Sequence, residues 1–239
     1  MSIPRLFVDQ PLAEGALVEA APGQAHHIGT VLRRGPGDPV RLFNVRDGEW
    51  AATIDSIRKD RARFAVTTQT RPPAAEPECR LVIAALKREP MDWVVEKATE
   101  LGATLIQPVL TQRSVADRAN ATRLTGIARA AAEQCERLTV PEVAEAQPLH
   151  RVLDGWNGAK LVVAMERSRA EPPRALPVPP GSPIALLVGP EGGFTAAELD
   201  DLRRRPFVVP AALGPRILRA ETAAVAGLAA LQALLGDWA

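Results

Sequence analysis

The chain has 239 residues, of which 46% are hydrophobic, and its formal net charge is +1. This length predicts one large domain or two modest domains with a sizeable buried core. The near-neutral balance excludes an overall basic protein, so any contact with nucleic acid must come from local patches of charge.

The composition also argues against membrane, secreted and metal-binding proteins. No apolar run has the length of a membrane span, and Pro4, Arg5 and Asp9 interrupt the N-terminus where a signal peptide would be apolar. Cys79 and Cys135 give no disulfide framework or metal-ligand spacing, and the three histidines do not make a metal site. We therefore expect a soluble, cytoplasmic protein that binds neither a metal nor a membrane.

The first seventy residues predict a small β-barrel, because short apolar runs alternate with turn residues. The expected strands are residues 6–8, 16–19, 40–43, 49–57 and 62–67. Asp47–Gly48 is typical of a hairpin turn. One helix is expected over residues 24–33, with Ile28, Val31 and Leu32 facing inward.

Arginines are frequent in this stretch and permit two interpretations. They form either a solvated face of the barrel or a patch that contacts RNA phosphates without reading the base sequence. The favoured phosphate contacts are Arg5, Arg33 and Arg34.

A polar, proline-rich segment over residues 70–78 predicts the boundary between two domains. We expect domains at residues 1–72 and 79–239, joined by a linker at 73–78. In the second domain strands and helices alternate, which predicts a mostly parallel sheet with helices on both faces.

The expected elements of this domain follow from apolar periodicity and helix-end signals. The expected strands are 81–86, 104–110, 160–165, 184–188 and 207–213, the last with Pro210 and therefore an edge strand or a late break. The expected helices are one capped by Asp92 and ending at Leu101, one over 120–138, one from Thr195, and one from about Leu218 to Gly236.

Two strand–glycine–helix corners are the most informative feature. Strand 184–188 ends at Gly189–Pro190, and Gly192–Gly193 then permits positive φ and close approach to the backbone. Thr195 with Glu198 forms a capping box. The run 207–213 ends in the same way, at a glycine and a proline. Such corners at strand ends are where α/β proteins bind ligands.

Each corner taken alone could be only a tight turn. Two of them, both glycine–proline and both flanked by charged residues, favour a ligand site. Neither corner carries a phosphate loop or a strand-linked G-x-G-x-x-G motif, which argues against ATP, GTP and NAD as ligands.

The two corners carry a family resemblance. Residues 187–193 (LVGPEGG) and 213–223 (LGPRILRAETA) resemble the RsmE family, which are ribosomal small-subunit RNA uridine-N3 methyltransferases of the SPOUT, trefoil-knot class. The resemblance covers nearly the whole chain. Further matching segments lie at 26–28, 31–33, 92–93, 96–102 and 132–135.

The resemblance implies a fold, a cofactor and partners. The fold would be a C-terminal SPOUT α/β trefoil-knot domain preceded by a small PUA-like β-barrel that binds RNA. The knot is expected from the resemblance alone, since knots are rare among folds. The methyl donor would be S-adenosylmethionine, the substrate 16S ribosomal RNA or the small ribosomal subunit, and the enzyme a homodimer.

The resemblance also implies donor-binding and RNA-binding residues. The expected donor-binding residues are Met165, Leu187, Gly189, Pro190, Glu191, Gly192, Gly193, Leu213, Gly214 and Leu218. The alternative for the leucines is a role in the core. Further RNA-facing residues would be Arg113, Gln134 and Arg137. Family members often have a small residue where this chain has Glu136.

The expected catalytic residues are Arg219 and Glu221. Arg219 would act as a fixed cation that favours the uracil N3 anion. Glu221 or Glu191 could accept the N3 proton. Each carboxylate also has a structural interpretation, because Glu191 could satisfy loop amides and Glu221 could stabilise the first turn of a helix.

Two other functions remain open at this point. One is methylation of the ribose 2′-oxygen by the same fold, and the other is a non-catalytic RNA-binding assembly factor with a degenerate knot. The intact glycine corners argue against degeneration.

Overall fold

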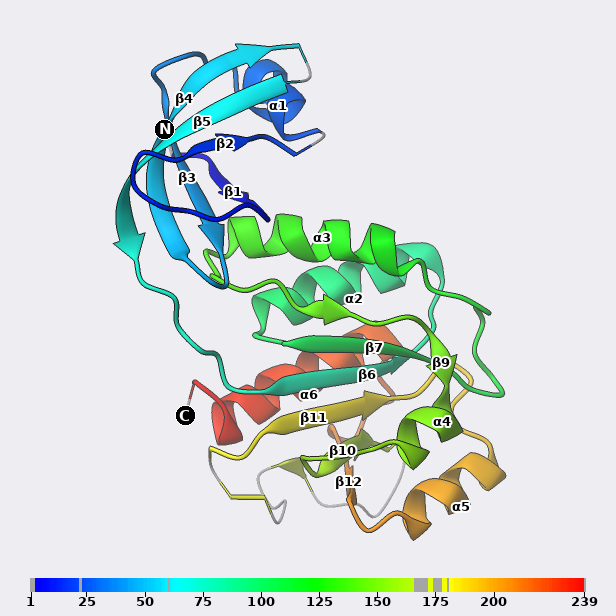
Figure 1. The fold of residues 1–239 in the computed structure, drawn as a ribbon. Coiled ribbons are helices and arrows are strands. Elements are labelled where there is room, and N and C mark those ends of the chain that lie inside the picture. The colour runs from blue at the N-terminus through cyan, green and yellow to red at the C-terminus, as the bar shows by residue number, and fades with distance from the viewer. Residues whose placement is uncertain are drawn as a thin grey trace. The chain divides into compact units, whose positions relative to one another are not determined.

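In the computed structural model, residues 3–21, 23–59, 61–165, 172–173, 178–179 and 181–238 are described. The chain forms two compact units (Figure 1). Unit 1 comprises Met1–Ala75 and Ala132–Val140, and unit 2 comprises Glu76–Ala131 and Pro141–Ala239. Residues 132–140 thus belong to unit 1, although the sequence placed them in the second domain. The boundaries 1–72 and 79–239 stay a prediction.

Unit 1 is built on a five-stranded sheet in the order β1-β3-β4-β5-β2. Its strands are β1 (Arg5–Phe7), β2 (Leu17–Glu19), β3 (Pro39–Asn44), β4 (Gly48–Arg58) and β5 (Arg61–Arg71). All pairs are antiparallel except β1 with β3. Three register shifts between β4 and β5 bend these long strands around a core that contains Leu42, Ile54 and Phe64.

The predicted helix of unit 1 is a short α1 (Gln24–His26) continued by a π-helical turn, η1 (His27–Val31). Ile28 is fully buried, as predicted, whereas Val31 is 60% exposed and Leu32 is 38% exposed. The inward orientation predicted for these two residues was wrong. The Leu32 N–H bonds the His27 carbonyl five residues back, so the turn does not follow the 3.6-residue period.

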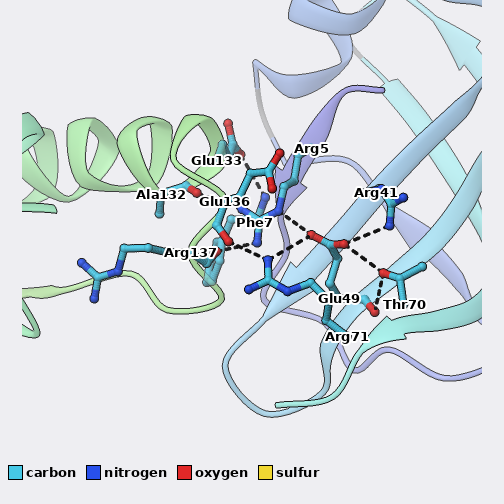
Figure 2. Close-up of polar contacts among 10 residues, drawn as sticks. All are labelled: Arg5, Phe7, Arg41, Glu49, Thr70, Arg71, Ala132, Glu133, Glu136 and Arg137. Atoms are coloured by element: carbon cyan, nitrogen blue, oxygen red, sulfur yellow. Dashed lines mark hydrogen bonds and ion pairs between the residues drawn. The ribbon is translucent and has the colours of Figure 1, made fainter. Parts of the chain in front are cut away.

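A nearly buried ion pair joins β1 to β4 in unit 1, and its arginine also hydrogen-bonds residues 132–140 (Figure 2). Arg5 Nε lies 2.6 Å from Glu49 Oε2, and the two side chains are 7% and 5% exposed. The same guanidinium donates to the carbonyl oxygens of Ala132 and Arg137 and lies 3.6 Å from the centroid of the Phe43 ring. The charge of Arg5 is therefore fully compensated inside unit 1.

The second carboxylate oxygen of Glu49 accepts two further hydrogen bonds, as Figure 2 shows. Arg41 Nη1 donates at 3.0 Å and the Thr70 hydroxyl at 2.9 Å. Burial opposes the charged form of Glu49, but the hydrogen bonds from Arg5 and Thr70 and the nearby arginine charges outweigh burial and lower its pKa. The Arg71 side chain donates to the carbonyl oxygen of Glu136 at 2.7 Å.

Residues 132–140 have two further features, a hydrogen bond to β1 and a residue in the left-handed region. The Phe7 N–H donates to Glu133 Oε1 at 2.9 Å, and burial raises the pKa of that carboxyl. Glu136 follows the end of its helix with φ 61°, in the left-handed region that favours glycine. This backbone conformation gives a physical reason for the small residue that the resemblance implies at position 136.

Unit 2 contains a seven-stranded sheet in which every pairing is parallel. The main order is β12-β10-β11-β6-β7-β8, with β9 pairing with β7. The strands are β6 (Cys79–Ala84), β7 (Leu105–Leu110), β8 (Glu142–Val143), β9 (Gln147–Pro148), β10 (Leu161–Ala164), β11 (Ile184–Val188) and β12 (Val208–Ala211). The predicted parallel sheet is confirmed, and β12 with Pro210 lies at its edge.

Helices cover both faces of this sheet. They are α2 (Arg88–Glu100), α3 (Ala121–Gln134), α4 (Leu149–Asp154), α5 (Ala196–Arg204) and α6 (Ala220–Leu235). On one face, Leu187 of β11 belongs to a cluster with Leu153 of α4 and Leu202 of α5. On the other face, Leu186 packs against Gly227 of α6. All five residues of β11 are therefore buried.

Two local predictions in unit 2 need correction. α2 begins after Lys87 rather than at Asp92, and Asp92 instead accepts a hydrogen bond from Arg123. α3 ends at Gln134, before the predicted residue 138. The short elements β8, β9 and α4 were not predicted. The trefoil knot stays a prediction, because most of residues 166–180, which connect β10 to β11, lie outside the described residues.

The buried ion pair predicts a pH-dependent stability. We expect Glu49→Gln to lower the free energy of unfolding by roughly 3 kcal/mol near neutral pH, because Arg5 keeps its charge and loses its partner. Since folding lowers the pKa of Glu49 below its ordinary 4.5, the stabilisation is present above that value and is lost as pH falls through the folded pKa.

The measurement is urea unfolding of the wild type and the variant between about pH 7 and pH 3.5. The difference in unfolding free energy between the wild type and the variant should narrow as the solution is acidified. Glu133 also has a shifted pKa, but it is present in both proteins, so its contribution cancels in this difference. A matched control is Asp55→Asn, which breaks the more exposed pair with Arg63 and should cost less than about 1 kcal/mol. An equal loss in both variants would contradict the role assigned to Glu49.

Candidate ligand site at the glycine corners

One cavity of about 520 Å³ in unit 2 is lined by both glycine corners. The sheet order explains why they meet, because β10 lies between β11 and β12. Parallel strands end at the same edge of a sheet, so the segments that follow β11 and β12 flank the end of β10. Met165, directly after β10, donates its N–H to the carbonyl of Ala211 in β12.

The first corner turns sharply from β11 towards α5. A Cβ at Gly189 would lie 2.9 Å from the Phe194 ring, so a larger residue would displace that ring. Gly193 has φ 68°, and its N–H donates to the Pro190 carbonyl at 2.9 Å. α5 then begins at Thr195, whose predicted capping box with Glu198 is confirmed.

The second corner leads from β12 to α6. Gly214 has φ 107°, a conformation that side chains oppose. Arg219 is the N-cap residue of α6, and its side chain makes no capping hydrogen bond. Ala220 and Ala223 from the first turn of α6 line the cavity. The positive end of the α6 dipole therefore adjoins the cavity.

The structure brings most of the predicted donor-binding residues together. Those that line the cavity are Met165, Gly189, Pro190, Glu191, Gly192, Gly193, Leu213, Gly214 and Leu218. Leu187 does not line it and is fully buried in the core cluster shared with α4 and α5. Because side chains alternate between the two faces of a strand, Leu187 points towards α4 and α5, so the core interpretation fits this residue.

Neither predicted catalytic residue is among those that line the cavity. Arg219 is exposed at the start of α6, next to the lining residue Leu218. Glu221 is half-buried in the first turn of α6. Their catalytic roles stay predictions.

Several lining residues were missed by sequence reasoning. They are Ala164, Val188, Phe194, Leu199, Arg203, Ala212, Pro215, Ile217, Ala220 and Ala223. Leu199 and Arg203 lie four residues apart and so occupy one face of α5, which the helical period could have indicated. That this face turns towards the cavity depends on the packing of α5.

Charge around the cavity is predominantly positive among the described residues. Arg113, Arg203 and Arg216 line it together with the single carboxylate of Glu191. Arg203 pairs with Asp200 at 3.2 Å. The described residues contain no group of three or more metal-ligating side chains of the His, Cys, Asp or Glu type. Within the same part of the chain, no helix is long and apolar enough to span a bilayer.

The predicted RNA contacts occupy different environments. Arg5 is held inside unit 1 by its ion pair with Glu49, so a phosphate could reach it only by displacing that carboxylate. Arg33 is exposed with φ 53°, and Arg34 is half-buried. Gln134 is exposed at the end of α3. Arg137 donates to the Thr139 hydroxyl. The remaining candidate, Arg113, lines the cavity of unit 2.

Comparison with known proteins defines the class. Residues 74–232 match the RNA methyltransferase domain family, and residues 22–67 match the RNA methyltransferase PUA domain family. A parallel α/β domain with a ligand cavity at its glycine corners, preceded by a PUA barrel, is thus an RNA methyltransferase architecture.

Individual relatives narrow the class. A ribosomal RNA small subunit methyltransferase E of Rickettsia conorii is 35% identical, over 99% of this chain and 98% of the relative. The solved methyltransferase E of Neisseria gonorrhoeae, bound to S-adenosyl methionine, is 30% identical with a TM-score of 0.88, and the whole of both chains is covered. A Legionella pneumophila methyltransferase in complex with SAM gives the same identity and TM-score over 99% of this chain and 100% of that one.

The chain belongs to the family of ribosomal RNA small subunit methyltransferase E.

The left-handed corner predicts a measurable cost of adding a side chain. Gly214→Ala places its Cβ in open space, so backbone strain alone should lower the free energy of unfolding, by about 1 kcal/mol. Chemical denaturation measures it. Gly155→Ala is the matched control within unit 2, because Gly155 has φ −89° and its Cβ would make an ordinary contact. Equal effects of the two substitutions would show that φ at Gly214 is not constraining.

Proposed function

We propose that this chain transfers a methyl group from S-adenosylmethionine to N3 of a uridine in the 16S RNA of the small ribosomal subunit. The observation that carries the proposal is the cavity formed by both glycine corners, in a family with solved members that hold S-adenosylmethionine. The family names specify small-subunit ribosomal RNA, and the choice of uracil N3 rests on the resemblance of the corner motifs.

The cavity fits the proposed donor. Its volume of about 520 Å³ lies within the range of small-molecule sites. Glycines at both corners let a ligand approach the main chain, whose N–H and C=O groups can bind the edge of an adenine. Leu213, Ile217 and Leu218 supply apolar walls. Of the residues that the sequence predicted to bind the donor, all except Leu187 line the cavity, and these are the proposed donor contacts.

When bound, the donor supplies an electrophilic methyl group on a sulfonium. The chain must then align uracil N3 with it and stabilise the anion that forms on loss of the N3 proton. Arg219 is exposed beside the cavity-lining Leu218, where it can meet a base that enters from solvent. The positive end of α6 acts in the same direction. The position of Glu191 on the cavity supports it as proton acceptor ahead of Glu221.

The proposed partners follow from the two units. The PUA barrel would hold RNA through phosphate contacts, with Arg33 and Arg34 as candidates, and Gln134 and Arg137 are further candidates.

We propose that the enzyme works in the cytoplasm as a homodimer. Light scattering of the purified chain measures the oligomeric state, and a monomer at micromolar concentration would contradict the dimer.

The decisive experiment is a nucleoside map of 16S ribosomal RNA from a strain that lacks this gene. We expect one N3-methyluridine to disappear and to return with the wild-type gene. Loss of a 2′-O-methylated nucleoside would instead assign ribose methylation, and an unchanged map would favour an assembly factor.

Complementation with Arg219→Ala should slow methylation by roughly 100-fold. Arg151→Ala, on the exposed surface of α4, is the matched arginine control.

A further inference from the structure

A short turn after β7 lies against the first glycine corner. It is closed by Ser114, whose hydroxyl accepts from the Thr111 N–H at 3.0 Å and whose own N–H donates to the Thr111 carbonyl at 3.2 Å. The turn is far from the corner in sequence. It nevertheless supplies Arg113 to the cavity wall.

Arg113 is fixed against the corner by its own side chain. Its Nη1 donates to the Gly192 carbonyl oxygen at 2.9 Å, and its carbon atoms lie 3.4 to 3.9 Å from the position of a Cβ at Gly192. A guanidinium has five N–H donors, and this bond uses one of them. Within the described residues no carboxylate forms an ion pair with Arg113, whereas Arg203 on the same cavity is paired with Asp200.

The carboxylate of Glu198 holds the turn in place. Its Oε2 accepts from the Thr195 N–H at 2.8 Å and from the Thr195 hydroxyl at 3.0 Å. Its Oε1 accepts from the Gln112 N–H at 2.8 Å. One side chain therefore ties the start of α5 to the residue immediately before Arg113. This contact to the turn is additional to the capping box, which needs only Thr195 and Glu198.

From this geometry we infer that Arg113 binds the carboxylate of the methyl donor and that Glu198 is the positioning residue for Arg113. The inference rests on the proposed function, which places S-adenosylmethionine in this cavity. A fixed, planar guanidinium on a cavity wall matches a planar carboxylate, and the pair forms charge-assisted hydrogen bonds. Because the guanidinium is already oriented by Gly192, little ordering is needed when the ligand arrives.

The test compares two ligands that differ only in the carboxylate. Calorimetry measures the binding of S-adenosylmethionine and of its decarboxylated analogue to the wild type, Arg113→Met and Arg113→Lys. Arg113→Met should weaken binding of the first ligand by about tenfold and of the second by less than about twofold. Arg113→Lys should recover part of the lost affinity, because it retains the charge without the fork geometry.

The possible outcomes separate the two proposals. If the wild type binds neither ligand, the proposed function fails. If the wild type binds the donor but Arg113→Met weakens both ligands equally or neither, the role of Arg113 is overturned. If the same variant binds both ligands normally and loses affinity for ribosomal RNA in a salt-dependent way, Arg113 contacts phosphate instead.

A second set of variants tests Glu198. If it acts through Arg113, Glu198→Ala should lower the preference for the carboxylated ligand by at least about threefold, and the double variant with Arg113→Met should bind like Arg113→Met alone. The control is Thr195→Ala, which removes the helix cap but leaves the contact with Gln112. It should lower thermal stability while keeping the ligand preference.

An additive double variant, or an unchanged preference in Glu198→Ala, would overturn the positioning role. Should Glu198→Ala fail to fold, Glu198→Asp serves instead. Its shorter side chain keeps a carboxylate that can cap α5 but withdraws it from the Gln112 N–H, so it should reduce the preference in the same direction.

Discussion

The cavity of unit 2 forms where two glycine-containing backbone turns face a shared space. Gly193 and Gly214 hold φ values of 68° and 107°, which the other amino acids adopt only under strain. Gly189 leaves room for the ring of Phe194. Each turn alone is a small local feature. Together, at the ends of strands separated by one neighbour, they form a site large enough for a nucleoside-sized ligand.

This arrangement requires a rigid support, which the sheet provides. β11 is buried along its whole length, with alternate residues packed against α6 on one face and against α4 and α5 on the other. Because packing on both faces fixes the strand, the position of its end is fixed too. The corner that follows starts from this fixed point. The tie from Glu198 to Gln112 extends the support to a turn that no sheet pairing holds.

The main physical constraint in unit 1 is a different one, the burial of charged side chains. Glu49 is nearly inaccessible to solvent, yet it stays ionised because Arg5, Arg41 and Thr70 surround it. The guanidinium of Arg5 in turn satisfies two carbonyls of residues 132–140 (Figure 2). Arg5, which the sequence favoured as a contact for RNA phosphate, is thereby held in a structural ion pair, because its partners come from distant parts of the chain.

The sequence by itself determined the strands of the barrel, the parallel character of the second sheet, the capping box at Thr195 and the two corners that line the cavity. These features depend on short-range chemistry: alternation of apolar residues, helix-end residues and glycines at fixed spacing. Only the tertiary structure decided that β10 lies between β11 and β12, that Leu187 faces the core, and that Arg113 and α5 reach the cavity. Strand order and the packing of distant segments arise from long-range contacts, which local periodicity does not encode.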